Sequence, residues 1–444
     1  EKSFLEELTD SKIMNNIFKF MIIVFLISTS IFSIVQNVQY VKELSKYRYY
    51  SAYYGALIDD EMKDDINEII KYINSQENQT IILSYYSNLY MNVLNRNNGK
   101  MDLPFYGNLG KKGEDGLINE IISDFSNQKH ISQDFATNYF YLSGSSIYST
   151  QNSDIQKVIE NECKNKKYIL KSSKNDDYAQ AAIVIMDQSN GYVIACSGGL
   201  GEKTKSRGFN RATQMKRQTG SSMKPVAVLA PAIEKKLVTN VTVFADEPTT
   251  FTDYNGEAYS PIDYDNYKGS ITLRQAVESS QNIPFVKLME QLTPQVSIRY
   301  LKKMGITTLN DKDVNLALAL GGLDQGISPL EFAGAYSSIA NDGIYIEPTF
   351  YTKINSHSNE TVLISKQKKR RVISKDAAFI LKQLLTEPVT GSAGTATYCS
   401  ISGMDVAAKT GTTNENYDRW LCGFTPYYTA VCWYGFDMNE SINF

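Results

Sequence analysis

Strand-like segments at two distant places in the chain constrain the fold most. Residues 181–199 read as an apolar strand, a turn containing Asn190-Gly191 and a second strand, which predicts a β-hairpin. Residues 404–413 and 419–437 predict three further strands near the C-terminal end. Helical patterns lie between them, including 373–385 with Ser374 as the expected N-cap. We therefore predict an α/β body of the α+β type, with a largely antiparallel sheet flanked by helices.

An apolar stretch near the N-terminus predicts a membrane span. Residues 17–38 contain a single charge, Lys19, and their 22 residues match the roughly 20 needed to cross a bilayer. No small-residue cleavage site follows, which favours an uncleaved signal anchor over a removed signal peptide. The alternative is a buried core helix. Lys12 and Lys19 favour a cytoplasmic tail over residues 1–16 and place the rest of this single-pass membrane protein outside the cell.

The segment that follows this span carries no chemical motif. Residues 39–140 are polar and rich in Tyr and Asn, and 59–73 has the pattern of a short amphipathic helix. We expect an extracytoplasmic spacer or a small helical region.

Composition excludes several classes of function. The net charge of −3 provides no basic field, so we expect no nucleic-acid partner. The chain has two histidines, far apart in sequence, which argues against a His-based triad or metal site. Five cysteines form no C-x-x-C pair. Cys422 and Cys432 flank a predicted turn and can face each other, but we favour small buried hydrophobes. We expect no cofactor and no metal.

One short stretch offers a nucleophile and a base. In "RQTGSSMKP", Ser221 is followed three residues later by Lys224, at the start of an apolar helical pattern. This S-x-x-K spacing is weak evidence alone, because 126–129 and 365–368 also match it. A serine at a helix start is also a preferred N-cap, so capping is the alternative. Pro231 lies inside the helical pattern and is expected to kink the helix or shift its neighbours.

Two distant motifs change this balance. "ESSQNIP" contains the S-x-N triplet 280–282, and "AAKTGTT" contains a K-T-G triplet at 409–411 that occurs once in the chain. Penicillin-binding proteins and β-lactamases carry S-x-x-K, S-x-N and K-T-G in this order. The flanking residues, including "GGLDQGISPLEFAGAYSSIANDGIYIEP", make the match specific. Over residues 141–444 the chain resembles the transpeptidase domain of class A penicillin-binding proteins.

The chemistry of the residues is consistent with that resemblance. A serine hydroxyl is a poor nucleophile until a neighbouring group takes its proton. With no suitable histidine, a lysine has to serve, and Lys224 lies on the same helical face as Ser221. Lys224 can act only when neutral, so its pKa has to be depressed by burial and by a second cation.

The resemblance implies the remaining roles. It implies a central five-stranded antiparallel sheet flanked by helices, with Lys409 as the second cation and Ser280 as the proton bridge to the leaving group. Asn282 is expected to bind the substrate amide, and Thr410 and Thr412 the terminal carboxylate.

Two further roles concern the oxyanion and the strand itself. By family geometry, the backbone N–H groups of Ser221 and Thr412 stabilise the oxyanion. Gly411 suits a strand that substrate has to approach closely.

The expected activity is that of a peptidoglycan D,D-transpeptidase, acylated by D-Ala-D-Ala stem peptides or by β-lactam antibiotics. The alternatives are a D,D-carboxypeptidase, or a penicillin-binding sensor or divisome scaffold whose catalysis is dispensable. The acidic E-D-x-x-F-type signature of a glycosyltransferase is absent from the sequence. We therefore expect no polymerase activity, and a separate glycan polymerase as a partner at the membrane.

Overall fold

The computed structural model describes most of the chain beyond residue 113. The described residues are 49–50, 57–58, 81–82, 114–202, 208–254, 256–356 and 359–442. The predicted anchor at 17–38 and the predicted helix at 59–73 lie outside them. Within the described part, no helix is both long and apolar enough to cross a bilayer.

The chain divides into two compact units. The first comprises 1–77 and 88–96 and contains the short antiparallel pair β1 (Tyr49–Tyr50) and β2 (Leu57–Ile58). The second comprises 78–87 and 97–444 and holds all the predicted site residues. The predicted division at residue 140 remains a prediction.

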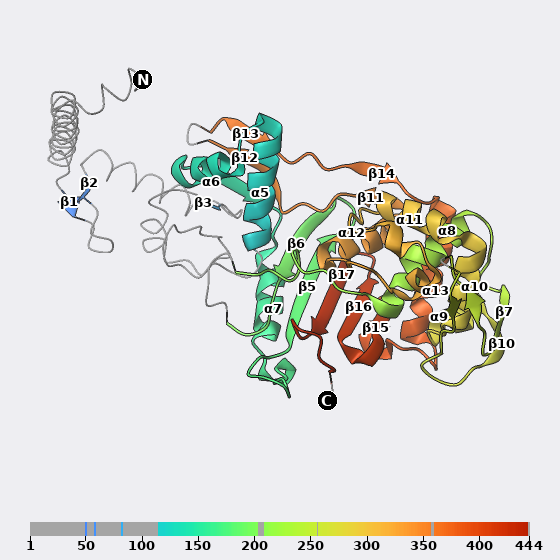
Figure 1. Cartoon of the computed structure of the whole chain (residues 1–444). Helices are drawn as coiled ribbons and strands as arrows, with labels where there is room; N and C mark the ends of the chain where they lie inside the picture. Colours follow the sequence, from blue (N-terminus) through green and yellow to red (C-terminus); the bar gives the residue numbers. More distant parts are fainter. Residues whose placement is uncertain are drawn as a thin grey trace, which may run out of the picture. The chain divides into compact units, whose positions relative to one another are not determined.

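A five-stranded antiparallel sheet forms the centre of this unit (Figure 1). Its order is β15-β16-β17-β5-β6, so the two hairpins predicted from distant segments pair through β17 and β5. The strands are β5 (Gln180–Asp187), β6 (Tyr192–Ser197), β15 (Ala407–Thr412), β16 (Asp418–Phe424) and β17 (Tyr428–Gly435). The predicted antiparallel sheet flanked by helices is confirmed, and β15 is one of its edges.

Helices cover this sheet. The almost wholly buried α12 (Pro329–Ala340) packs across β5, β16 and β17. Its Phe332 and Tyr336 side chains are completely excluded from solvent. Helix α7 (Ser153–Cys163) packs on β6 and α13 (Lys375–Thr390) on β15. Ser374 accepts a hydrogen bond from Ala377 N, which confirms the predicted N-cap. The other helices are α8 (Ala230–Glu234), α9 (Leu273–Glu278), α10 (Ile283–Leu292) and α11 (Pro294–Lys303).

A second sheet, with order β13-β12-β4-β3, lies beside two N-terminal helices. Glu120 and Asp124 hold the first of these helices in place: Glu120 accepts from Thr349 Oγ1 (2.5 Å) and Phe350 N (2.8 Å), and Asp124 accepts from Tyr351 Oη (2.6 Å). These elements are α5 (Glu114–Lys129), α6 (Gln133–Leu142), β3 (Ile81–Ile82), β4 (Ser146–Ser149), β12 (Tyr351–Asn355) and β13 (Thr361–Ile364).

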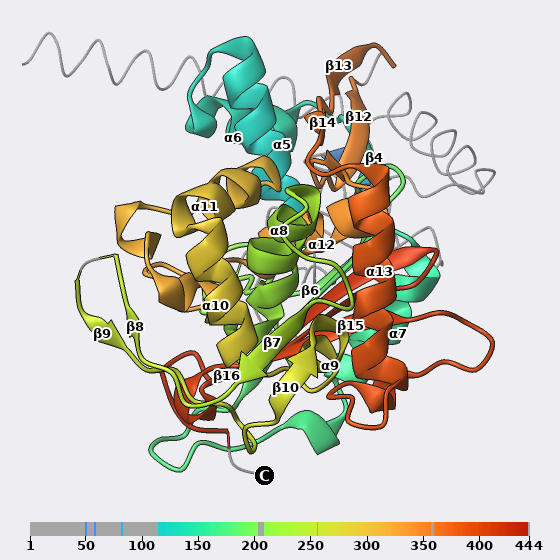
Figure 2. The ribbon, with the colours of Figure 1, turned by 90° about the vertical axis from the view of Figure 1, so that its right-hand side faces the viewer.

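Three two-stranded pairs complete the described part of the unit (Figure 2). They are β7 (Val243–Asp246) with β10 (Gly269–Thr272), β8 (Phe251–Thr252) with β9 (Ala258–Tyr259), and β11 (Ile344–Ile346) with β14 (Lys369–Arg371).

The cysteines do not pair. The β16–β17 register places Cys422 opposite Val431 and Cys432 opposite Leu421, so the two thiols do not face each other as the sequence suggested. All five cysteines are free, and Cys163, Cys196 and Cys422 are buried. The prediction of small buried hydrophobes is therefore confirmed for these three.

The helical segment after Ser221 is not one regular α-helix. Gly220–Met223 is a 3₁₀ turn, Pro225–Leu229 is π-helical, and α8 follows. Pro231 has no N–H, so it cannot donate to the carbonyl of Ala227 as a regular helix requires. Ser297 Oγ donates to that carbonyl instead, at 2.6 Å. The predicted effect of Pro231 is confirmed, in the form of a widened turn.

Replacement of Ser297 tests this account. We expect Ser297→Ala to lower the free energy of unfolding by about 2 kcal/mol, because the buried Ala227 carbonyl loses its donor. Ser338→Ala is the matched control. Ser338 is equally buried, but its Oγ donates to a carbonyl inside α12 that can keep its helical partner. Chemical denaturation measures both, and equal losses would contradict the assignment.

Candidate active site

The turn that carries Ser221 is wedged between two segments of backbone. Gly220 has φ +55°, and a Cβ there would lie 2.4 Å from Thr412 O. On the other side, a Cβ at Gly321 would lie 2.4 Å from Gly220 O. The turn therefore fits only because Gly220 and Gly321 lack side chains. This close packing holds Ser221 next to the edge strand β15.

Gly411 takes part in the same close packing. A Cβ on Gly411 would lie 2.2 Å from Thr219 O and 2.7 Å from Ser222 Oγ. The sequence suggested that this glycine leaves room for substrate. The structure adds a different requirement, because the serine turn itself occupies the space that a side chain would need.

Hydrogen bonds from the core hold the turn. Tyr336 Oη donates to Ser222 O at 2.6 Å, and Trp420 Nε1 donates to Gln218 O at 2.8 Å. Ser222 is buried, and its hydroxyl donates to Thr219 O at 2.6 Å. Ser221 is half-buried, and within the described structure its hydroxyl has no such partner. Ser222 is thus a structural residue, and Ser221 has the available hydroxyl and caps no helix.

Lys224 is wholly buried beneath the S-x-N triplet. Its Nζ donates to Ser280 O (2.8 Å), Gln281 O (2.9 Å) and Asn282 Oδ1 (2.7 Å), and lies 3.4 Å from Ser280 Oγ. It also lies 4.8 Å from the centre of the Phe285 ring. Among the described residues its hydrogen bonds go to this triplet rather than to Ser221. Catalytic hydrogen bonds often tighten only when substrate binds.

Ser280 joins the two predicted lysines. Lys409 Nζ donates to Ser280 Oγ at 2.7 Å, so one hydroxyl lies between Lys409 and Lys224. Ser280 has φ +59°, a left-handed conformation that is unfavourable for a residue with a side chain. Such strain persists where the surrounding structure holds it, and it is common at functional sites.

Burial changes the proton affinity of both lysines. Loss of solvent lowers the pKa of Lys224 well below its ordinary value, and the charge of Lys409 lowers it further, against the opposing effect of Asp263 and Asp246. Burial also lowers the pKa of Lys409 to about 7. Both shifts favour the neutral form of these lysines more than in an exposed lysine.

The other predicted residues surround this centre. Asn282 Nδ2 donates to Ile262 O at 2.6 Å, and its second proton remains for another acceptor. Thr410 and Thr412 alternate with Lys409 and Gly411 along β15, so the two threonines share one face of the strand. Thr412 is exposed, and Thr410 Oγ1 donates to Thr395 Oγ1 at 2.9 Å.

Sequence reasoning missed two acids near this centre. Asp246 and Asp263 are both buried and bind the residues that follow Ser280. They lie on segments far apart in sequence and belong to no short motif, so a single sequence contained no signal for them.

A hollow of about 320 Å³ begins where β15 ends. Gln218, Thr413 and Tyr417 are among its lining residues, so it adjoins the turn of Ser221 and Thr412. None of the predicted site residues lines it. In the described part of the chain, no group of acidic, His and Cys side chains is arranged to hold a metal ion.

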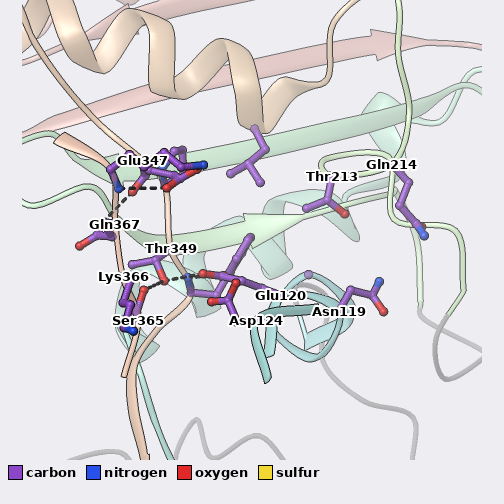
Figure 3. A pocket seen from close by; sticks show the side chains of 15 residues that line it. Asn119, Glu120, Asp124, Thr213, Gln214, Glu347, Thr349, Ser365, Lys366 and Gln367 are labelled. Atoms are coloured by element: carbon purple, nitrogen blue, oxygen red, sulfur yellow. Dashed lines mark hydrogen bonds and ion pairs between the residues drawn. The ribbon is translucent and has the colours of Figure 1, made fainter. Parts of the chain in front are cut away.

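A larger cavity, of about 550 Å³, lies away from this centre (Figure 3). Figure 3 shows Glu120, Thr349 and Ser365 meeting in it, and Thr349 Oγ1 lies 2.8 Å from Ser365 Oγ. Burial raises the pKa of Glu120 to about 8. None of the predicted site residues lines this cavity, and its carboxyl groups serve to attach α5.

Comparison with known proteins gives a consistent result. The family described as "Penicillin binding protein transpeptidase domain" matches residues 181–435. A penicillin-binding protein 1A of Clostridium botulinum is 35% identical over 336 residues, which cover 73% of this chain and 40% of the relative. Penicillin-binding protein 1F of Bacillus subtilis is 35% identical over 272 residues, covering 60% of this chain and 36% of that protein. The chain thus spans about 40% of the curated relatives that it matches.

Solved structures share the fold. A penicillin-binding protein from Mycobacterium tuberculosis aligns with a TM-score of 0.61 and 25% identity, over 74% of this chain and 85% of that one. The complex of the same protein with penicillin V aligns with a TM-score of 0.61 and 23% identity, over 75% of this chain and 89% of that one.

Gly411→Ala tests the packing of the serine turn. We expect it to lower the free energy of unfolding by about 3 kcal/mol, because the new methyl group overlaps backbone that cannot move independently. Gly199→Ala is the control, since a Cβ there meets only the ends of the Arg211 and Gln180 side chains, at 3.2 Å. Denaturant unfolding of both variants measures the difference. A loss at Gly411 no larger than that at Gly199 would contradict the close-packing argument.

Proposed function

Because this chain belongs to the penicillin-binding protein transpeptidase family, we propose that it is a serine D,D-transpeptidase that crosslinks peptidoglycan stem peptides. In this proposal the D-Ala-D-Ala end of a stem peptide acylates Ser221, and penicillin acylates the same hydroxyl. The observation that carries it is the pair of buried lysines, Lys224 and Lys409, on either side of the Ser280 hydroxyl.

Acylation begins with the transfer of a proton from Ser221 to the base. Lys224 lies three residues after Ser221 in the chain, and burial favours its neutral form. The Ser221 oxygen attacks the carbonyl carbon of the penultimate D-Ala. The peptide bond breaks, and the amine of the terminal D-Ala receives a proton from Lys224 through Ser280. The products of this half-reaction are free D-Ala and an ester on Ser221.

The second half-reaction restores the enzyme. An amine from a neighbouring stem peptide attacks the ester carbonyl and gives up a proton to the lysine–serine pair. The ester bond to Ser221 breaks, and the new amide bond is the crosslink. No cofactor enters either half, because acyl transfer needs only the nucleophile, the base and oxyanion donors.

Other groups orient the substrate in this proposal. The backbone N–H groups of Ser221 and Thr412 hold the oxyanion, and the side chain of Asn282 binds the substrate amide. Thr410 and Thr412 bind the terminal carboxylate, with the positive charge of Lys409 nearby. The exposure of Thr412 and its position on the same face of β15 as Thr410 support these roles.

We also propose that residues 17–38 anchor the protein in the cell membrane, with the catalytic domain outside. Their apolar composition supports this proposal. A separate glycan polymerase would then supply the uncrosslinked strands.

Covalent labelling by a fluorescent penicillin tests the nucleophile. We expect the wild-type chain to be labelled and Ser221→Ala to lose labelling completely, because the acyl ester forms on the Ser221 hydroxyl alone. Ser222→Ala is the matched control. It should keep the label and lose about 1 kcal/mol of stability, since it removes one buried hydrogen bond. Label that survives Ser221→Ala would refute the assignment.

Product analysis then separates the acceptors. Penicillin labelling together with crosslinked muropeptides among the products supports the transpeptidase. Penicillin labelling with release of D-Ala but without crosslinks supports a carboxypeptidase. A wild-type chain that takes no label supports a scaffold.

A further inference from the structure

Two buried acids lie against the S-x-N triplet. Asp246 ends β7, and Asp263 lies between β9 and β10. Asp246 Oδ2 accepts hydrogen bonds from Lys268 N (2.8 Å) and Gln281 Nε2 (3.0 Å). Asp263 Oδ1 accepts one from Asn282 N. Each acid therefore binds a residue of the triplet 280–282, whose oxygens bind Lys224.

Each acid also has one oxygen without a donor. Asp246 Oδ1 and Asp263 Oδ2 are buried, and no donor among the described residues reaches either atom. The carboxyl group of Asp246 lies close enough to that of Asp263 to help raise the pKa of Asp263. Ionised carboxylate oxygens only accept, so a hydrogen bond between the two groups needs a proton on one of them. A shared proton also explains why two buried oxygens have no other partner.

Among the residues that the structure describes, the neighbouring cations have other partners. Lys224 donates to the triplet, Lys409 donates to Ser280, and Lys268 lies 3.7 Å from Asp265. On α10, Lys287 donates to Ala245 O and lies 3.9 Å from Glu247. Burial, reinforced by Asp246, raises the pKa of Asp263 to about 6, whereas Asn282 N and Lys224 lower it.

We propose that Asp246 and Asp263 share one proton and act as a positioning pair for the reaction. The pair holds the backbone of Asn282 and the side chain of Gln281, and so fixes the oxygens that bind Lys224. It also limits the negative charge close to Lys224. The inference rests on the proposed acylation of Ser221, and it adds two residues and a pH dependence to that function.

The charge argument gives a direction. When the pair loses its proton, a second negative charge appears near Lys224, and both acids raise the pKa of that lysine. A protonated Lys224 cannot accept the proton of Ser221. Loss of the shared proton therefore opposes acylation, whereas neutralising one acid without losing its hydrogen bonds favours it.

Three variants at this loop test the proposal. In Asp263→Asn the amide oxygen can still accept from Asn282 N, and the amide N–H can donate to Asp246 Oδ1, with no titrating proton. Asp263→Ala removes both the charge and the hydrogen bonds. Asp265→Asn is the control, because it removes one exposed negative charge from the same loop.

The rate of acylation by a fluorescent penicillin is measured across the neutral pH range for each full-length variant. We expect Asp263→Asn to be acylated efficiently. Its acylation rate should increase with pH as in the wild type, but the increase should occur at lower pH. Asp263→Ala should be acylated about tenfold more slowly at every pH, because Asn282 N loses its acceptor. Asp265→Asn should coincide with the wild type.

Two results would overturn the pair. One is an Asp263→Asn profile that coincides with the wild type, and this comparison does not depend on whether Asp263→Ala folds. The other is equal rates for folded Asp263→Ala and Asp263→Asn, as judged by thermal unfolding. A wild-type chain that is not acylated at all overturns the proposed function, and the inference with it.

Discussion

The site depends on one hydroxyl between two buried lysines. Two ammonium groups in so small a volume repel each other, and neither has bulk water to stabilise its charge. Ser280 and the carbonyls beside it provide the oxygens that bind both nitrogens. Burial lowers the pKa of both lysines, and the charge of Lys409 lowers that of Lys224 further. In a chain without a suitable histidine, burial thus favours the neutral, basic form of a lysine.

The fold brings these groups together from three separate segments. Strand β15 contributes Lys409, the turn before the π-helical segment contributes Lys224, and the short connection before α10 contributes Ser280. Contact between the first two is possible because Gly411 and Gly220 let backbone meet backbone. The hydroxyl of Ser297 donates to the Ala227 carbonyl in place of the N–H that Pro231 lacks. Packing, rather than local sequence, therefore sets the geometry of the base.

Much of this was predictable from the sequence. Apolar segments separated by turns identify β5, β6, β16 and β17, and the order of three short motifs identifies the residues around Ser221. The acid pair was not predictable, because Asp246 and Asp263 meet only when β7 and the loop before β10 pack on the triplet. The positions of Cys422 and Cys432 depend on a strand register that a turn alone does not determine. The need for a glycine at 411, to leave room for the serine turn, depends on close packing against Thr219, which is distant in sequence.

The most direct test of the central claim is a titration of Lys224 itself. Lysine labelled with ¹³C at Cε gives a resonance that reports the charge of each amine, and Lys224→Met assigns the resonance in question. Burial and Lys409 predict a midpoint well below the ordinary lysine value, and Lys409→Met should raise it by removing the neighbouring charge. A Lys224 resonance that titrates like an exposed lysine, and that does not respond to Lys409→Met, would contradict the account.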